Sequence, residues 1–457
     1  MLDKKSLLIG CGAGFAGDRL DAALPIVEEL AASGKPAYLM LETLAERTLA
    51  LAQLQRRHDP DAGYLPSLAE LIGPVLSLCL AHRIPIIGNF GAANPLAAAR
   101  RVVATARTLG CGEIRVAAVT GDDLLATISP EKLLAMRFSP PAVIEAGGLV
   151  SANVYLGAQG IAEALKMGAD VIVTGRVADP ALALGPLVHH FGWRWDDWDL
   201  MAAGVLTGHL LECGAQVTGG YFADPGFKDV PDLANVGYPI AEISAAGLIT
   251  ITKPRGTGGL VSEQTVKEQI LYEIHDPSAY LTPDVTLDLS QVQVRQDGPD
   301  RVRVTGARGK PRPDTLKGTV CFDGGWMGEG EISYAGHNCR ARGMLAIEVL
   351  KSRLRTLDLA LDSHFDLIGV GSVFNDAQGQ WLARSGPCDV PDVRVRMAVS
   401  AMDRRQVERA LHEVEALYTT GPAGGGGVRM QVTPLMNSTS VFVDRSAVEA
   451  QVTILEG

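Results

Sequence analysis

The first half of the chain alternates short apolar runs with segments of helical periodicity, and this alternation constrains the fold more than any other feature. We expect strands at 6–10, 37–41, 84–88, 114–119 and 170–174. Amphipathic segments such as 19–33, 95–109 and 157–167 separate them and are expected to be helices. Apolar strands between amphipathic helices indicate a parallel sheet that is covered on both faces. The N-terminal part is therefore predicted to be a doubly wound, Rossmann-like α/β domain.

The pattern changes after residue 235, where paired strands replace single ones. Segments 240–244 and 249–252 are predicted to form a hairpin. Further strands and helices are expected at 262–274, 285–288, 291–295, 301–305, 319–322, 331–335, 340–355, 365–373, 393–400, 404–418 and 428–433. This order is typical of an α+β domain with a mainly antiparallel sheet. We assign residues 1–265 to the doubly wound domain and 266–457 to the smaller α+β domain.

Composition and charge exclude several classes of protein. A formal net charge of −11 disfavours binding to nucleic acid or to membrane surfaces, which normally requires basic excess. The seven cysteines are scattered and never spaced C-x-x-C, so they predict neither a disulfide framework nor a structural zinc site. No apolar run approaches the roughly 20 residues of a membrane span. We expect a cytoplasmic protein whose ligand is a small molecule.

A glycine-rich turn directly follows the first predicted strand. Gly12, Gly14 and Gly17 spell G-x-G-x-x-G, the pattern typical of a dinucleotide site. Glu42, at the end of the second strand, is placed to bind a ribose hydroxyl as in NAD folds. One hypothesis is therefore an NAD(P)-dependent oxidoreductase that uses this turn.

The charges after the glycines favour another ligand. Asp18 and Asp21 crowd the predicted helix start and would repel a pyrophosphate placed there. We therefore expect the turn to bind a different anionic group. Its predicted contact residues are Gly12, Gly14, Phe15, Gly17, Asp18 and Arg19.

Polar residues also follow the third and the last strand of the predicted sheet. Asn94 and Asp179 each precede a proline, so helix capping explains both, although both remain candidates for substrate binding. Asn89 has no such explanation and lies where an open sheet presents its ligands. Arg176 either binds a substrate carboxylate or phosphate, or pairs with Asp179.

His209 and Glu212 lie three residues apart on the predicted helix 198–214, so they share one face. A histidine that a carboxylate orients is a candidate general base, and an ordinary buried hydrogen bond is the alternative. A single H-x-x-E pattern is half of a carboxylate-bridged di-metal site, which requires two copies. No metal is predicted.

Two loops carry further candidate residues. Residues 218–228 are irregular and rich in glycine and aromatic residues, which suits an active-site loop containing Tyr221, Asp224 and Lys228. Residues 253–259 combine basic side chains with glycine, and Arg255 there is a candidate for binding phosphate or carboxylate. An interdomain linker is the alternative explanation of the second loop.

Six stretches of the sequence, taken in order, resemble one protein family. The stretches are GCGAGFAGDR, LETLAERTLA, NFGAANP, GRVADPAL, GHLLECGAQVTGGYFADPG and YEIHDPSAYLTPDV. Together they are similar to the acyclic terpene utilisation (AtuA) family, from about residue 6 to the C-terminus. The resemblance implies catabolism of branched or terpenoid acids, with cleavage or hydration of a CoA-linked intermediate. It also implies a small C-terminal α+β domain that this sequence lacks, so we expect this domain either to be a separately encoded partner subunit or to have been lost. We also expect an oligomer.

The leading hypothesis is a lyase or hydro-lyase that acts on a small acyl-CoA or branched carboxylic acid. His209, oriented by Glu212, would move the proton, while Arg176 and Asn89 would hold a carboxylate or enolate oxygen. Tyr221 completes the predicted catalytic set. No cofactor is predicted beyond CoA as part of the substrate. The alternatives are the oxidoreductase above and a non-catalytic subunit that needs a small partner.

Overall fold

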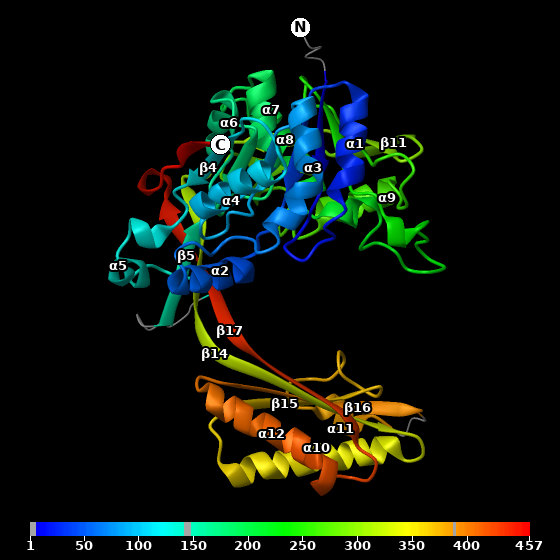
Figure 1. Ribbon diagram of the computed structural model, residues 1–457. Coiled ribbons are helices and arrows are strands. Elements are labelled where there is room, and N and C mark those ends of the chain that lie inside the picture. The colour runs from blue at the N-terminus through cyan, green and yellow to red at the C-terminus, as the bar shows by residue number, and fades with distance from the viewer. Residues whose placement is uncertain (1–5, 141–147, 387–389) are drawn as a thin grey trace. The chain divides into compact units, whose positions relative to one another are not determined.

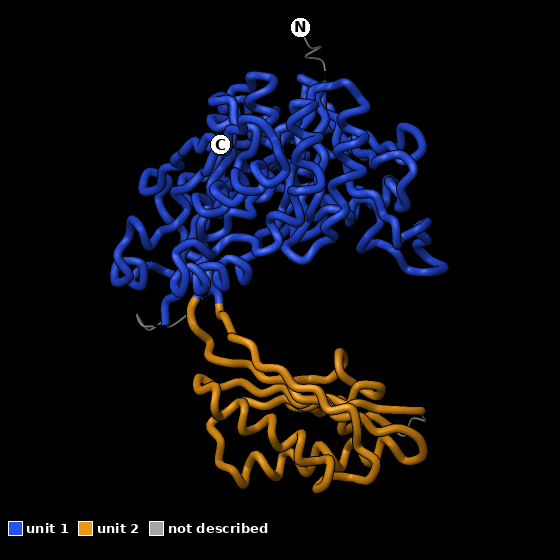
Figure 2. Tube along the Cα trace, in the orientation of Figure 1, with its two compact units in different colours: residues 1–321, 438–457 blue, residues 322–437 orange. Residues whose placement is uncertain are grey.

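The computed structural model describes residues 6–140, 148–386 and 390–457 (Figure 1). The chain divides into two compact units (Figure 2): unit 1 comprises 1–321 with 438–457, and unit 2 comprises 322–437. The chain enters unit 2 within β14 (Thr315–Ala335) and leaves it within β17 (Gly426–Asp444). The boundary expected at 265/266 lies inside α9 (Glu263–Leu271) of unit 1.

A large mixed sheet forms the centre of unit 1. Within the described residues it has ten strands in the order β11-β12-β8-β7-β1-β2-β3-β6-β4-β18. Neighbours from β1 to β4 in this order are parallel, and β7 and β18 flank them in antiparallel orientation. The strands of this sheet are β1 (Ser6–Cys11), β2 (Ala37–Leu41), β3 (Ile86–Gly88), β4 (Arg115–Thr120), β6 (Val171–Thr174), β7 (Ile240–Ser244), β8 (Ile249–Thr252), β11 (Gln293–Gly298), β12 (Arg301–Thr305) and β18 (Gln451–Glu456).

The predicted hairpin is present, since β7 pairs with β8 in antiparallel register. It extends the large sheet next to β1 instead of starting a second domain. The hairpin joins the large sheet because its apolar side chains, Ile240, Ala241 and Ile243, are buried in the core of unit 1.

Helices cover both faces of this sheet, because β1 divides its side chains between two hydrophobic cores. Leu7 and Ile9 belong to one core and Leu8 to the other, as the alternation of a strand requires. The helices of unit 1 are α1 (Ala23–Ser33), α2 (Glu46–His58), α3 (Leu68–His82), α4 (Pro95–Thr108), α5 (Pro130–Leu134), α6 (Gln159–Lys166), α7 (Ala181–Phe191), α8 (Trp198–Leu211) and α9. Helices α1, α3 and α4 contribute to the core that contains Leu8, and α6, α7 and α8 to the other.

Helix α1 begins later than the sequence suggests. It starts at Ala23, and turns occupy the residues after the glycines, so the expected start at Arg19 is wrong. From Ala23 onward the spacing is helical, with Ala23, Ile26, Val27 and Leu30 buried on one face. The charged residues before Ala23 find partners within the turn, as described below.

A small three-stranded antiparallel sheet lies beside α8 and also belongs to unit 1. Its strands are β9 (Tyr280–Leu281), β10 (Thr286–Asp288) and β13 (Arg308–Lys310). Separately, β5 (Leu149–Val154) pairs with β14. These strands bring Tyr155 and Tyr280 toward residues that follow the parallel strands. Within the described residues, no helix combines the length and apolar character needed to cross a membrane.

Unit 2 has the element order β-α-β-β-α-β, with the short α11 between its second and third strands. The elements are β14, α10 (Cys339–Leu357), β15 (Asp362–Ile368), α11 (Gln380–Arg384), β16 (Asp392–Ala401), α12 (Arg404–Thr420) and β17. The strand order β15-β16-β14-β17 and this connectivity are those of a ferredoxin-like fold. Helices α10 and α12 lie on one face of the sheet (Figure 1). The strands expected separately at 319–322 and 331–335 are one strand, β14.

Candidate active site

A buried arginine lies at the carboxyl edge of the parallel strands. Arg176 follows β6 and is 1 % exposed. Its Nε and Nη2 donate to the carbonyl of Val177 at 2.9 and 2.7 Å, and Nη1 donates to the carbonyl of Leu44. Nη2 also pairs with Asp179, and the guanidinium lies 4.6 Å from the ring centroid of Tyr155. Of the two alternatives left open by the sequence, the structure contains the local pairing.

Glu42 is a buried carboxyl beside this arginine. It follows β2, and its Oε1 accepts hydrogen bonds from Asn89 Nδ2 and from the Leu44 N–H, both at 2.8 Å. Burial and the negative charge of Asp179 raise the pKa of Glu42 well above its usual value, although Arg176 opposes this shift. The surroundings of Glu42 therefore favour its protonated form.

Asn89 fixes the loop that carries Glu42. It follows β3, is completely buried, and its Oδ1 accepts the Thr43 N–H at 2.7 Å. Because its Nδ2 binds Glu42, both ends of the amide have partners in the chain. Asn89 thus lies in the predicted region, where it positions the end of β2.

Glu46 and Tyr155 form a second pair beside Arg176. Tyr155 follows β5, and its hydroxyl donates to Oε1 of Glu46 at the start of α2. Burial opposes ionisation of Glu46, but this hydrogen bond lowers the pKa of the carboxyl below its usual value. Lys317 Nζ lies 5.1 Å from the Tyr155 ring centroid and adds positive charge. Glu46 is therefore held in its ionised form.

Asp179 behaves in the opposite way. Burial raises its pKa to about 7, and the negative charges of Glu212 and Glu46 contribute, whereas Arg176 lowers it. Its side chain is 33 % exposed, so it is more accessible than Arg176. Asp179 does not cap a helix as its sequence context suggests, because α7 begins at Ala181 and has no side-chain cap. The carboxylate pairs with Arg176 instead. We call Glu42, Glu46, Tyr155, Arg176 and Asp179 the Arg176 cluster.

His209 and Glu212 are brought together at the end of α8. His209 Nδ1 lies 2.8 Å from Glu212 Oε1, and its Nε2 lies 3.2 Å from the carbonyl of Ile270. Burial opposes protonation, but Glu212 and these hydrogen bonds raise the pKa of His209. Because both ring nitrogens have partners inside the protein, His209 orients Glu212. Within the described residues Glu212 Oε2 has no hydrogen-bond partner.

Tyr280 lies beside this pair, with its ring centroid 5.8 Å from that of His209. Burial raises the pKa of Tyr280, and the negative charges of Glu212 and Asp179 add to the shift. Tyr280 therefore keeps its proton and can donate a hydrogen bond. Its electrostatic interaction with Asp179 and Tyr155 links the end of α8 to the Arg176 cluster.

Asp122 supports the cluster from the end of β4. Its Oδ2 accepts the Arg176 N–H at 2.9 Å and Asn153 Nδ2 at 2.8 Å. Burial raises the pKa of Asp122 to about 6, and these hydrogen bonds oppose the shift. Asp122, Asn153 and Asn94 also line a cavity of about 520 Å³ at the same edge of the sheet. Asn94 itself caps α4 by accepting the Ala97 N–H at 3.3 Å, as its position before a proline indicates.

The glycine turn is closed by groups of its own chain. The Gly14 N–H donates to Asp18 Oδ2 at 2.8 Å, and Asp18 Oδ1 accepts the Arg19 N–H at 2.9 Å and the Tyr238 hydroxyl. The Arg19 side chain pairs with Asp21 at 2.9 Å. Asp18 thus occupies N–H groups to which a nucleotide phosphate would bind.

The glycines themselves allow close packing. A Cβ on Gly14 would lie 2.5 Å from the backbone of Cys213 and Gly214, and one on Gly12 would lie 2.7 Å from Ala23. A Cβ on Gly17 would meet the ring of Phe15, which is exposed. Because these glycines have no Cβ, neighbouring parts of the chain pack directly against their backbone.

The predicted loop residues lie elsewhere. Tyr221 is 79 % exposed, and Asp224 and Lys228 exchange backbone hydrogen bonds within a turn. Lys228 Nζ pairs with Glu268 at 2.6 Å, and Arg255 Nε pairs with Glu29 at 2.9 Å. In the described part of the chain, no contact joins Tyr221, Asp224, Lys228 or Arg255 to the Arg176 cluster. No group of three His, Cys, Asp or Glu among the described residues is placed to hold a metal ion.

Sequence reasoning missed Glu46, Asp122, Tyr155 and Tyr280. Glu46 lies in the stretch LETLAERTLA and Tyr280 in YEIHDPSAYLTPDV. Both stretches resemble the family, but the resemblance assigns no chemical role to either residue. Asp122 follows a predicted strand. Asn89 was selected because ligands bind beyond the carboxyl ends of parallel strands, and the same argument selects Asp122. Tyr155 reaches the site through the pairing of β5 with β14, which no local pattern indicates.

Comparison with known proteins gives one match over nearly the whole chain. The family model described as "Acyclic terpene utilisation family protein AtuA" matches residues 7–454. No protein with a curated description matches. Among solved structures, the de novo designed protein Ferredog-Diesel is 17 % identical and covers 23 % of this chain and 85 % of its own, with a TM-score of 0.16.

Proposed function

The chain belongs to the acyclic terpene utilisation (AtuA) family, and from this premise we propose that it is a catabolic hydro-lyase. Its proposed substrate is a branched acyl thioester, either α,β-unsaturated or 3-hydroxylated. We take the parallel strands to be part of a doubly wound, Rossmann-like sheet. In such sheets ligands bind beyond the carboxyl ends of the strands. The Arg176 cluster lies at that edge.

One observation carries the proposal. Two carboxyls beside one buried arginine have pKa values that their surroundings move in opposite directions: burial raises that of Asp179 to about 7, and the Tyr155 hydrogen bond lowers that of Glu46. Pairs of titratable groups separated in this way supply an acid and a base in one site. Asp179 is accordingly the proposed acid and Glu46 the proposed base.

The proposed reaction adds water across the C2–C3 double bond. Glu46 removes a proton from water, the water oxygen bonds to C3, and the π electrons move toward the thioester carbonyl to give an enolate. Asp179 then delivers its proton to C2, and proton exchange with solvent restores both carboxyls. Tyr280, which keeps its proton, would donate a hydrogen bond to the enolate oxygen. The reverse sequence eliminates water from the 3-hydroxy compound.

The remaining residues act as positioning residues. Arg176 holds Asp179 in place, and His209 orients Glu212 through the 2.8 Å contact. The ionised Glu46 would repel a free carboxylate at the reacting end of the substrate, so an uncharged thioester carbonyl fits this site better. This argument favours the acyl-CoA over the free acid as the substrate.

Two substitutions test the proposed roles. Asp179→Asn and Glu46→Gln should each lower kcat by at least about 100-fold, because each removes a proton-transfer group. The measurement is loss of the enoyl-thioester absorbance, over a panel of 3-methyl-branched 2-enoyl-CoA substrates. Asp196→Asn is the matched control, since Asp196 pairs with Arg194 on the surface. Wild-type rates in Asp179→Asn would contradict the proposal.

A further inference from the structure

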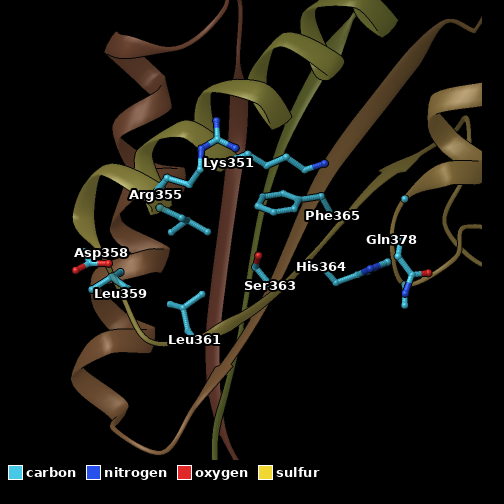
Figure 3. Close-up of a pocket in the computed structure, with 12 residues that line it drawn as sticks. Lys351, Arg355, Asp358, Leu359, Leu361, Ser363, His364, Phe365 and Gln378 are labelled. Atoms are coloured by element: carbon cyan, nitrogen blue, oxygen red, sulfur yellow. The ribbon is translucent and has the colours of Figure 1, made fainter.

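Unit 2 contains a cavity of about 530 Å³ that is separate from the Arg176 cluster (Figure 3). The C-terminal half of α10, the start of β15 and residues 377–379 line it. Lys351 and Arg355 come from the helix, and Ser363 and His364 come from the strand. Figure 3 shows His364 directed toward Gln378. A mixed lining of charged and apolar side chains in a cavity of this size is typical of a small-molecule site.

The two cations of this cavity lack acidic partners. Lys351 and Arg355 are four residues apart on α10, so they share one face of the helix and repel each other. Within the described residues neither side chain forms an ion pair. The basic residues predicted from the sequence to bind anions do have acidic partners: Arg19, Arg176, Lys228 and Arg255 each form an ion pair. Free positive charge therefore lies at this cavity, in a chain whose net charge is −11.

His364 lies at the edge of this cavity and points away from the two cations. The side chains of a strand alternate between its two faces, and Phe365 packs with α10 in the core of unit 2, so His364 lies on the opposite face of β15. There its Nε2 lies 2.9 Å from Oδ1 of Asp366, which is buried and is fixed in turn by Asn375 Nδ2 and by Arg396 Nη1, both at 3.0 Å. Ser363 shares the face of Phe365, so it is the polar side chain of the strand that lies on the side of Lys351 and Arg355.

Apolar side chains form the rest of the lining. Leu354, Leu361 and Phe365 border the cavity, and Lys351 Nζ lies 5.4 Å from the Phe365 ring centroid. Asp358 is the acidic residue of the lining, so Lys351 and Arg355 leave an excess of positive charge. A ligand that matches this lining combines an anionic group with an apolar body.

We propose that this cavity binds an organic phosphate, namely a phosphate monoester with an apolar substituent. Lys351 and Arg355 form ion pairs with the phosphate oxygens, and guanidinium geometry suits two parallel hydrogen bonds to them. Ser363 completes the polar contacts, and the substituent packs on Phe365. This site is independent of the hydro-lyase reaction proposed for unit 1.

Calorimetric titration of the full-length protein tests the site with phenyl phosphate, inorganic phosphate and phenol. Phenyl phosphate should bind at least about tenfold more tightly than either of its two parts, because only it makes both kinds of contact. The double variant Lys351→Gln/Arg355→Gln should weaken this binding by about tenfold or more, since charge-assisted hydrogen bonds are lost. Arg405→Gln, an exposed residue on α12, is the control and should bind as the wild type does.

Three results would overturn the proposal: no binding of phenyl phosphate, equal affinity for inorganic phosphate, or unchanged affinity in the double variant. Lys351 and Arg355 are exposed, so their substitution leaves the core of unit 2 intact. Urea unfolding curves that coincide with the wild type verify this. His364→Gln provides a second control, and it should bind phenyl phosphate as the wild type does, because His364 lies on the opposite face of β15.

Discussion

At the scale of single residues, charge balance explains the chemistry of the Arg176 cluster. Among the described residues, three carboxyls act on the one guanidinium: Asp179, Glu42 and Glu46. Arg176 neutralises only one negative charge, and an unpaired buried charge is costly. The pKa values of Glu42 and Asp179 are accordingly raised, which favours their protonated forms, while the lowered pKa of Glu46 favours its ionised form. A stored proton next to a carboxylate is what an acid–base reaction needs.

The effect of burial on a carboxyl pKa can also be tested at Asp122, through the pH dependence of the free energy of unfolding. Burial raises its folded-state pKa from 3.8 to about 6, so the unfolded chain releases this proton at lower pH than the folded protein. Its contribution to folding is fully present below pH 4 and is lost as the pH rises to about 6. Relative to Asp122→Asn, the wild type should therefore lose on the order of 3 kcal/mol of unfolding free energy between pH 4 and pH 7.

Urea unfolding of both proteins at pH 4, 5, 6 and 7 measures this difference. Asn keeps the shape and the acceptor oxygen of the protonated acid, so the Arg176 N–H and Asn153 retain a partner in the variant. A wild-type minus variant difference that stays constant across this range would show that Asp122 ionises in the folded protein as it does in the unfolded chain.

Several of the site residues were predictable one by one, but their roles were not. Asn89, Arg176 and Asp179 follow strand ends, which is a local property of the sequence. The pairs Arg176–Asp179 and His209–Glu212 each span three residues, so both were among the alternatives that the sequence left open. Packing with distant segments decides between these alternatives, as in the contacts of Arg176 with Leu44 and of His209 with Ile270. Pattern and spacing do not show which distant group a polar side chain meets.

At the scale of elements, the glycine turn is explained by packing against the end of α8. Gly14 faces the backbone of Cys213 and Gly214, and a Cβ there would lie 2.5 Å from both. Backbone atoms move less readily than side chains, so no small shift relieves this contact. Gly14→Ala should lower the free energy of unfolding by about 1–3 kcal/mol or more.

Gly112 is the matched control for this substitution. It is exposed in the connection before β4, and a Cβ there meets nothing within 4 Å. Gly112→Ala should raise the free energy of unfolding by about 0.4–1 kcal/mol, because alanine restricts the unfolded chain. Urea unfolding compares the two variants. Equal effects at the two positions would contradict the packing role of Gly14.

Most elements were predictable because each has a strong local period. Strands β1 to β4 and helices such as α4 and α12 lie within a few residues of the expected positions. The misplaced start of α1 has a physical cause: Asp18 and Arg19 bind partners in the turn and do not continue the helix. β14 was divided because glycines interrupt its apolar pattern at Gly324, Gly325 and Gly328.

At the scale of the whole molecule, unit 2 is inserted into unit 1. Its two connecting strands, β14 and β17, each cross the boundary without a turn, so no loop marks either crossing. Unit 1 also resumes with β18, which pairs with β4 more than 300 residues earlier. A linear pass through the sequence places a boundary where composition changes, whereas this boundary lies inside strands.

Separate hydrophobic cores predict separate responses to core damage. Leu350 on α10 is completely buried in the core of unit 2, so Leu350→Ala should cost about 2–5 kcal/mol in that unit. Hydrogen exchange measured by mass spectrometry should accelerate for the paired residues of β14 and β16. Exchange in β1 and β2 should stay as in the wild type. Equal acceleration in both regions would show that the two cores unfold together.

The central claim is that Asp179 holds a proton near neutral pH. Carbon-13 NMR of protein labelled at the aspartate carboxyl carbon tests it directly, with the resonance absent from Asp179→Asn giving the assignment. Because burial outweighs the attraction of Arg176, we predict a titration midpoint at about pH 7 for Asp179. A midpoint near the ordinary aspartate value of about 3.9 would contradict the proposed acid.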